Sequence, residues 1–124
     1  MLGRMASKAE VVISVSAVED AIRLVEEAES QDHSIMIYLI GEESLDSNGR
    51  YLSVTGASSD EAGAVGVCVL STEGGTEPDE SQIHLFSSLF PEGVLMVVDP
   101  YAGEFSLSMV DERGIRRASA LLSG

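Results

Sequence analysis

Basic residues, cysteines and long apolar runs are scarce in this chain of 124 residues. Seven Lys and Arg residues stand against 21 Asp and Glu residues, which gives a formal net charge of -14 at pH 7. So acidic a chain lacks the positive surface that nucleic-acid phosphates and anionic membranes attract, so we expect neither as a partner. Cys68 is the single cysteine, which excludes a disulfide within the chain. No apolar run reaches the roughly 18 residues of a membrane-spanning helix.

The N-terminal residues and the length predict the location and the number of domains. The first six residues lack the apolar core of a secretory signal peptide, which predicts a cytoplasmic protein. Residues 1–9 are expected to form a flexible leader. Residues 10–124 then have the length of one domain, and the 44% hydrophobic content of the chain is that of a globular protein.

Three explanations fit the strong acidity. It can be an adaptation to a salt-rich cytoplasm, where salt screens the self-repulsion of such a surface. It can be the ordinary net charge that keeps a protein soluble, or a surface that docks onto a basic partner. The absence of a long acidic run slightly favours the second explanation, but the sequence does not separate the three.

The spacing of apolar residues predicts two helices and seven strands. The helices are predicted at residues 18–30 and 79–90, each with one apolar stripe. Ser16 and Glu19 form a predicted capping box before the first helix, and Asp79 begins the second. The strands are predicted at residues 10–15, 35–40, 50–58, 64–70, 94–98, 105–109 and 115–122.

Three of the predicted strands are almost wholly apolar, which indicates that both of their faces are buried: residues 35–40, 64–70 and 94–98. The two amphipathic helices are available to cover those faces. We therefore predict an α/β fold, a single-domain layered structure in which a mixed β-sheet has helices on both faces.

Few side chains are candidates for chemistry. His33 and His84 are the only histidines, and they lack the spacing of a metal-binding pair, so we expect both at the surface. Cys68 lies in an apolar run, where a free cysteine is usually a small buried hydrophobic residue. No glycine motif for phosphate or dinucleotide binding is complete. The residues alone therefore predict no catalytic site, no metal and no other cofactor.

One segment resembles a known family. Asp79 precedes a predicted helix, and residues 89–100 then read Leu-Phe-Pro-Glu-Gly-Val-Leu-Met-Val-Val-Asp-Pro. This pattern is similar to the second half of an MPN (JAMM) domain, in which an aspartate opens a helix that ends at a Phe-Pro-Glu-like stop before a strand ending in Val-Val-Asp-Pro. The order of the earlier elements is similar as well. The resemblance covers about residues 10–110 and implies an MPN/JAMM-like fold.

The resemblance also implies the positions of a degenerate zinc site. Active MPN domains are zinc isopeptidases that remove ubiquitin-like tags, and their signature is a glutamate, two histidines separated by one residue, a serine and an aspartate. These positions fall on Ser34, Gly66, Cys68, Thr76 and Asp79. Only Asp79 matches, and a catalytic zinc needs three protein ligands. The resemblance therefore implies a protein that has no catalytic residues and carries no stoichiometric zinc.

The predicted function is that of a catalytically inactive MPN-like domain, a protein-interaction or scaffold module. The resemblance implies pairing with an active MPN isopeptidase or a ubiquitin-like system, and a homodimer is the other expected partner. Leu85 and Leu89 lie one turn apart on the flank of the second helix's apolar stripe and form the candidate interface, unless the loop at residues 71–78 covers them. Two alternatives stay open: a small-ligand-binding or regulatory domain that uses the vacated cleft, and an enzyme of unrecognised class.

Overall fold

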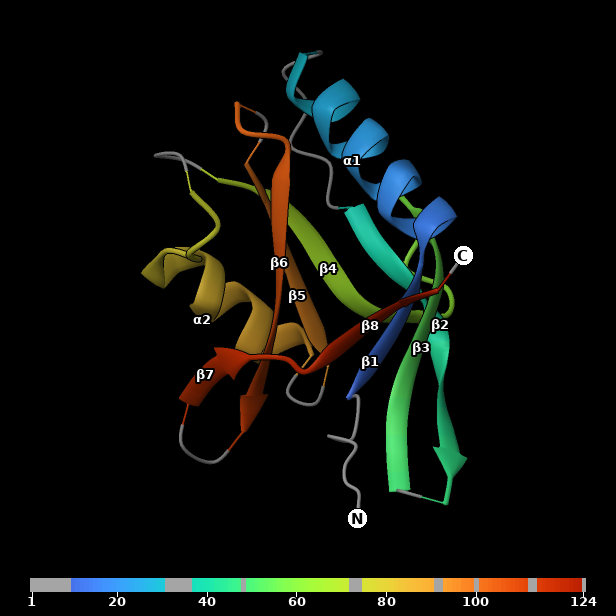
Figure 1. Cartoon of the computed structure of the whole chain (residues 1–124). Helices are drawn as coiled ribbons and strands as arrows, with labels where there is room; N and C mark the ends of the chain where they lie inside the picture. Colours follow the sequence, from blue (N-terminus) through green and yellow to red (C-terminus); the bar gives the residue numbers. More distant parts are fainter. Residues whose placement is uncertain are drawn as a thin grey trace.

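The structure is a computed structural model that describes residues 10–30, 37–47, 49–71, 75–90, 93–99, 101–111 and 114–123. The predicted leader and the position of Ser34 lie outside the described residues, as does His33. Figure 1 shows the elements in their chain order, which is β1 (Val11–Ser14), α1 (Val15–Ser30), β2 (Ile37–Asp46), β3 (Gly49–Ser58), β4 (Ala64–Leu70), α2 (Glu80–Leu89), β5 (Val94–Asp99), β6 (Glu104–Asp111), β7 (Gly114–Arg117) and β8 (Ala120–Ser123).

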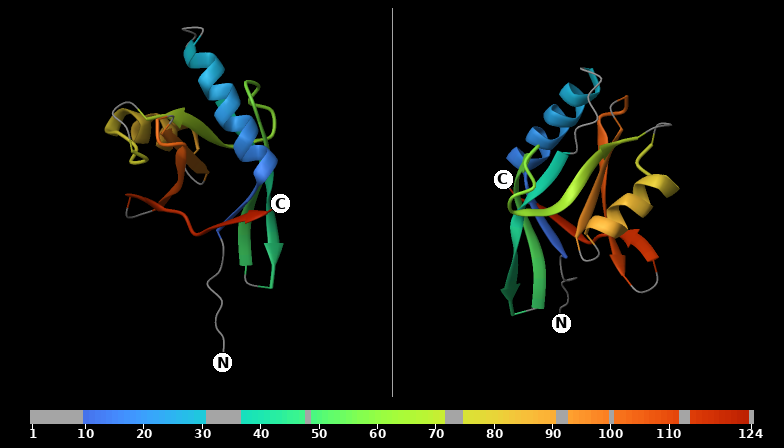
Figure 2. Two further views of the ribbon diagram at one scale, coloured as in Figure 1. Left: turned by 45° about the horizontal axis from the view of Figure 1, so that its top comes forward. Right: turned by 180° about the vertical axis from the view of Figure 1, so that it is seen from behind.

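All eight strands belong to one sheet, in the order β7-β6-β5-β4-β2-β3-β1-β8. Strand β1 is parallel to β3 and to β8, and β4 is parallel to β5, whereas the other neighbours are antiparallel. Strands β7 and β8 lie at opposite ends of this order, although only residues 118 and 119 separate them in the chain. The sheet therefore curls until its two ends approach each other, and it forms the half-barrel seen in Figures 1 and 2.

Hydrogen bonds and an ion pair join the two ends of the sheet where the chain passes from β7 to β8. The amide of Ala118 donates to the carbonyl of Leu107 in β6 at 2.9 Å. The amide of Glu10, just before β1, donates to the carbonyl of Ser119 at 2.7 Å. The guanidinium of Arg116 pairs with the Glu10 carboxylate. The curl is thus closed on this side by direct contacts between segments that lie far apart in the sequence.

The predicted α/β layered fold, MPN/JAMM-like with helices on both faces of the sheet, is wrong. Strands take up 53% of the described residues and the two helices only 26%, and α2 buries a single side chain completely, that of Phe86. Strand β5 is buried along its whole length, as predicted. Helices are not its only cover, because Met96 of β5 shares a core cluster with Val11 and Ile13 of strand β1. The curled sheet therefore covers part of its own strands. An apolar run does not show whether a helix or another strand covers it.

Two core clusters hold the elements together. The larger cluster lies on the inner side of the curl and includes the buried stripe of α1, whose spacing confirms the predicted amphipathic helix: Ala17, Val18, Ala21 and Val25. The smaller cluster joins Phe86 of α2 to three strand residues, Val67, Leu95 and Val97. Because neighbouring residues of β4 and β5 alternate between the two clusters, Cys68 packs on the side of α1 and Val67 on the side of α2.

One of the two predicted helix starts is confirmed. The Asp79 carboxylate caps α2 by accepting a hydrogen bond from the Gln82 amide at 2.8 Å, and the Gln82 side chain accepts one from the Asp79 amide at 3.0 Å. The predicted capping box at Ser16 is wrong, because the amide of Ala17 donates to the hydroxyl of Ser14 at 3.0 Å. Helix α1 therefore begins earlier than predicted, and Ser16 lies in its first turn.

Two strand boundaries also differ from the prediction. The segment at 115–122, predicted as one strand, is divided between β7 and β8. The region at 42–49, predicted as a turn, is mostly strand, because β2 continues to Asp46 past an irregularity between Ile40 and Gly41. Gly41 permits this close pairing, since a Cβ atom there would lie 1.8 Å from the carbonyl oxygen of Ser53.

Candidate functional site

Two of the positions that correspond to zinc-site residues of MPN domains, Gly66 and Cys68, lie in β4. Cys68 is 2% exposed and belongs to the core cluster beneath α1. Burial raises the pKa of its thiol to about 12, so the thiolate that binds metals and attacks electrophiles does not form near neutral pH. Gly66 packs directly on β5, because a Cβ atom there would lie 1.9 Å from the carbonyl oxygen of Val94. Strand β4 therefore supplies backbone packing and a buried thiol at these positions.

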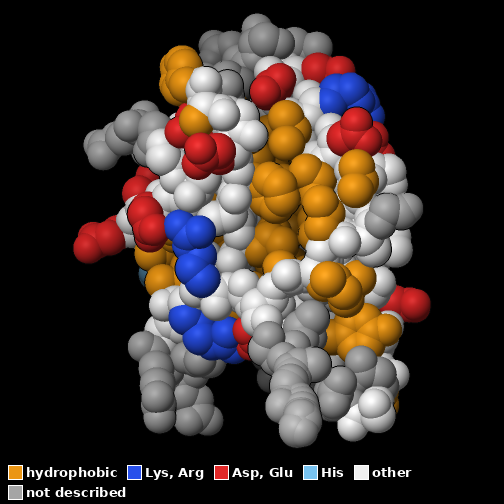
Figure 3. Space-filling view, in the orientation of Figure 1, with side chains coloured by type: hydrophobic (Ala, Val, Ile, Leu, Met, Phe, Trp, Pro, Cys, Tyr) orange, Lys and Arg blue, Asp and Glu red, His pale blue; other side chains and the backbone are white. Residues whose placement is uncertain are grey.

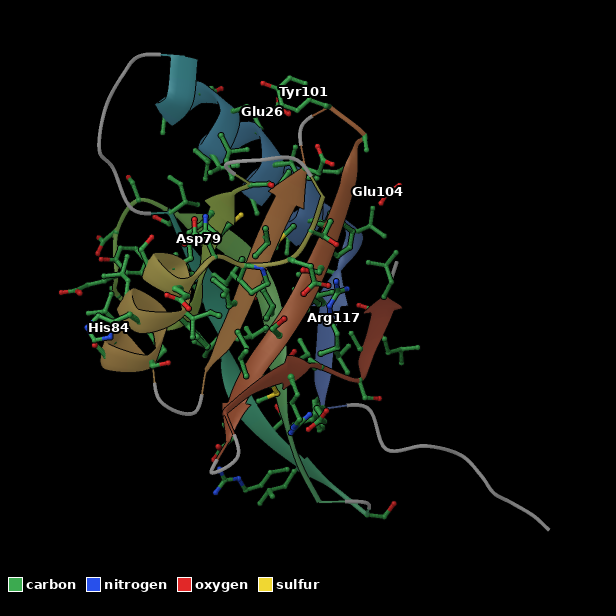
Figure 4. All side chains as sticks on the ribbon, turned by 90° about the vertical axis from the view of Figure 1, so that its left-hand side faces the viewer. Glu26, Asp79, His84, Tyr101, Glu104 and Arg117 are labelled. Carbon is green, nitrogen blue, oxygen red and sulfur yellow. The ribbon has the colours of Figure 1, made fainter. Side chains whose placement is uncertain are left out.

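Thr76 and Asp79 lie in the segment before α2, and the side chains of both form hydrogen bonds within the protein. The Asp79 carboxylate caps the helix and also accepts a hydrogen bond from the Ser81 hydroxyl at 2.8 Å, and Figure 4 shows Asp79 near the start of α2. The Thr76 hydroxyl accepts a hydrogen bond from Arg117 at 3.2 Å. Cys68 packs on the other side of the sheet from α2. Within the described ranges, no group of three or more His, Cys, Asp and Glu side chains could hold a metal ion.

Asp99, at the end of β5, holds the segment before α2 in place. Its carboxylate accepts hydrogen bonds from the amides of Gly75, Tyr101 and Ala102 at 2.7, 3.0 and 3.3 Å. The bond from Gly75 does most to lower the pKa of Asp99; burial opposes it, and the other two amides add to the lowering. An aspartate that starts a turn commonly accepts bonds from the next amides in the chain. The bond from Gly75, 24 positions earlier, has no signal in the sequence.

The outward face of α2 is formed by its exposed residues: Glu80, Ser81, His84, Leu85, Ser88 and Leu89. The side chains of Leu85 and Leu89 are 42% and 47% exposed, which confirms that both leucines stay accessible. Figure 4 shows His84 on the outer side of this helix. Of the loop at 71–78, the alternative cover for the leucines, Gly75 and Thr76 are bonded to β5 and β6, and residues 72–74 lie outside the described residues. The prediction that His84 lies at the surface is confirmed as well.

A second apolar area lies on the open side of the curl. Figure 3 shows hydrophobic side chains exposed between α1 and β6. Near the junction of β1, β8 and α1, the side chains of Val15, Leu121 and Leu122 are 40%, 57% and 56% exposed. The other large apolar side chains that are exposed in the described residues are the two leucines of α2, Leu45 of the β2–β3 hairpin at 75% and Tyr101 between β5 and β6 at 90%.

No protein-family model matches this sequence, and a search of curated proteins finds no match either. The resemblance to MPN domains therefore stays a prediction that rests on residues of this chain alone. Neither of the described helices combines the length and the apolar composition that a membrane crossing requires.

Proposed function

We propose that this chain is a non-catalytic protein-interaction module that pairs through the outward face of α2. The observation that carries the proposal is the exposure of Leu85 and Leu89, 42% and 47%, one turn apart on the same helix. Exposed apolar side chains that adjoin each other gain free energy when a partner removes them from water. Phe86 meanwhile anchors the other side of α2 in the core, so the helix presents the leucines on a fixed support.

The distribution of charge favours a second copy of this chain as the partner. The outward face of α2 carries one charged residue, Glu80 in its first turn, whereas the polar side of α1 carries four acidic residues, Glu19, Asp20, Glu26 and Glu27. Two copies with a net charge of -14 repel each other, and the repulsion is weakest where the facing surfaces carry the fewest charges. A two-fold axis through this face would place the leucines of one copy against those of the other.

Sedimentation tests this pairing with three proteins. The wild-type chain is expected to show a concentration-dependent shift from monomer to dimer. The double variant Leu85→Glu, Leu89→Glu places two carboxylates in the contact, so it is expected to stay monomeric at every concentration. Leu45→Glu adds one carboxylate, half of the charge that the double variant adds, at a leucine that is 75% exposed in the β2–β3 hairpin. It is expected to dimerise like the wild type apart from the general effect of that one charge.

Two results would contradict the proposal. A wild-type chain that remains monomeric would exclude a homodimer through α2. A dimer that persists in the double variant would place the interface elsewhere, for example on the open side of the curl. Circular dichroism of all three proteins shows whether the variants keep their fold, which is expected because the substituted side chains are already exposed.

Other parts of the predicted function rest on the sequence alone. Pairing with an active MPN isopeptidase or a ubiquitin-like system depends on the resemblance, and so does a ligand site in the vacated cleft. An enzyme of unrecognised class is the remaining alternative. A cytoplasmic setting belongs to the proposal as well, and it is supported by a single buried thiol, which suits a reducing compartment.

A further inference from the structure

A small hollow of about 160 Å³ lies between β6, β7 and the segment that leads into α2. Its polar lining residues include Ser108, Arg117 and Glu77, and its apolar ones are Pro78, Ile83 and Ile115. Figure 4 shows Arg117 beside strand β6. The hollow is separate from the outward face of α2, so a ligand in the hollow and a dimer through α2 are independent of each other.

The register of two strands brings Ser108 and Arg117 together. They are directly opposite each other in the antiparallel pair β6–β7, so their side chains leave the sheet on the same face. Ser106 lies two positions before Ser108 and therefore on this face as well. Its hydroxyl donates to the carbonyl of Thr76 at 2.7 Å, which holds the segment before α2 against β6. The sheet and this segment thus form two walls of the hollow.

Ser108 is the unexplained group in the hollow. The residue is only 2% exposed, and its hydroxyl forms no hydrogen bond with any residue that the structure describes. Ser106, two residues earlier on the same face of β6, does have a partner, because its hydroxyl donates to the carbonyl of Thr76. A buried hydroxyl without a partner is unfavourable and rare in folded proteins. A hydroxyl that lines a hollow obtains its partner from whatever enters that hollow.

Arg117 shows which chemistry the hollow accepts. Its guanidinium already donates to the Glu77 carboxylate at 2.7 Å and to the Thr76 hydroxyl at 3.2 Å. The Glu77 side chain is 83% exposed, so little packing holds its carboxylate in place. Exposed ion pairs of this kind contribute little free energy. A carboxylate from another molecule can therefore replace that of Glu77, and it gains the buried hydroxyl of Ser108 in addition.

We propose that this hollow binds the carboxylate of a small organic acid. Arg117 forms an ion pair with the carboxylate, and the Ser108 hydroxyl donates a hydrogen bond to it. Ile83 and Ile115 contact a short apolar tail. The size agrees, because cavities of about 150 Å³ hold a molecule of some six heavy atoms. Butyrate has that size and both chemical parts. Inorganic phosphate, the other common small anion, has no part that would contact the two isoleucines.

Titration of the full chain with butyrate, followed by NMR, tests the site. Saturable shifts are expected for the backbone amides of Ser108 and Arg117 and for the methyl groups of Ile83 and Ile115. Phosphate and chloride at the same ionic strength are expected to give weaker binding or none. Arg117→Gln and Ser108→Ala should each raise the dissociation constant about tenfold, a change of about 1.4 kcal/mol. Glu77→Gln should lower it severalfold, because it removes the competing carboxylate.

Arg50→Gln is the matched control. Arg50 is an exposed arginine that pairs with Glu43 at 2.9 Å in the β2–β3 hairpin, so its loss changes the net charge by the same amount without touching the hollow. It should leave butyrate binding unchanged. The absence of saturable shifts in both the wild type and Glu77→Gln would overturn the proposal, because water alone would then satisfy Ser108. Tighter binding of phosphate than of butyrate would overturn it too, since the apolar wall would then have no role.

Discussion

Among single residues, Val97 reports on the contact between β5 and α2. Its side chain is fully buried in the cluster that contains Phe86. Val97→Ala is expected to leave a void and lower the free energy of unfolding by about 1–3 kcal/mol, somewhat less than the usual cost of Leu→Ala. Urea denaturation measures this change. Leu45→Ala, at a position that is 75% exposed, should change it by about 0.5 kcal/mol at most. An unchanged midpoint for Val97→Ala would mean that β5 is not central to the core.

Asp99 makes the stability of the molecule depend on pH. In the unfolded chain its carboxyl titrates near 3.8, and in the folded chain the amide of Gly75 is the largest cause of a lower pKa. A lowered folded pKa means that the ionised group contributes its full stability above the unfolded pKa and loses it as the pH falls through the folded pKa. Asp99→Asn cannot ionise. We therefore expect a lower free energy of unfolding at neutral pH and a shallower loss of stability in acid.

Denaturation curves measured from about pH 6 down to about pH 2 would show both effects. Glu104→Gln removes an exposed carboxylate from the neighbouring strand and is the control for the loss of one negative charge. If Asp99→Asn lost stability in acid as steeply as the wild type, then other carboxylates would govern the acid response.

At the scale of the secondary-structure elements, the start of α1 shows which of two nearby serines caps the helix. The sequence alone does not distinguish them. The Ser14 hydroxyl accepts the hydrogen bond from the Ala17 amide at 3.0 Å, whereas Ser16 is exposed in the first turn. Ser14→Ala is expected to lower the free energy of unfolding by about 1 kcal/mol, the usual effect of a lost cap. Ser16→Ala should have a much smaller effect, measured by the same urea denaturation. A larger loss for Ser16→Ala would restore the predicted capping box.

The elements themselves were largely predictable from local patterns. The predicted limits of β4 agree with the structure, and Asp79 correctly marked the start of α2, because alternation and capping are properties of neighbouring residues. The break at residues 118–119 was not predictable. It exists because β7 pairs with β6 while β8 pairs with β1, and a pairing between distant strands leaves no mark on a short segment.

The same limit applies to the sites. The exposure of Leu85 and Leu89 followed from the helical period, which is local. The meeting of Ser108 with Arg117 depends on the register of a strand pair, and the bond from Gly75 to Asp99 depends on how a loop folds back on the sheet. A serine between apolar residues in β6 looks like an ordinary outward-facing residue. Only the tertiary structure shows that Ser108 is buried and that it lines the same hollow as Arg117.

For the whole molecule, the layered prediction failed because it assigned the cover of each apolar strand to a helix. The chain instead rolls one sheet around its own core, so that α1, β1 and β5 contribute to a single cluster. This arrangement makes stability depend on the closing contacts. Strand β8 pairs with β1 at four positions, and the residues just before it bond to β6 and to the segment before β1. Loss of β8 should therefore loosen the sheet far from β8 itself.

Cys68 provides the readout for that expectation, because it is the single cysteine, is 2% exposed and lies in β4, which neighbours neither β1 nor β8. A chain ending at Ser119 is expected to lose about 2 kcal/mol or more of unfolding free energy, since it gives up several backbone hydrogen bonds. A thiol reagent should then modify Cys68 more than tenfold faster, because the thiol reacts only when the sheet opens.

Leu121→Ser is the control, since it alters a side chain that is 57% exposed and keeps the backbone pairing. If the shortened chain protected Cys68 as well as the full chain does, β8 would be a peripheral strand, and the β4–β5 half of the sheet would hold its core without closure of the curl.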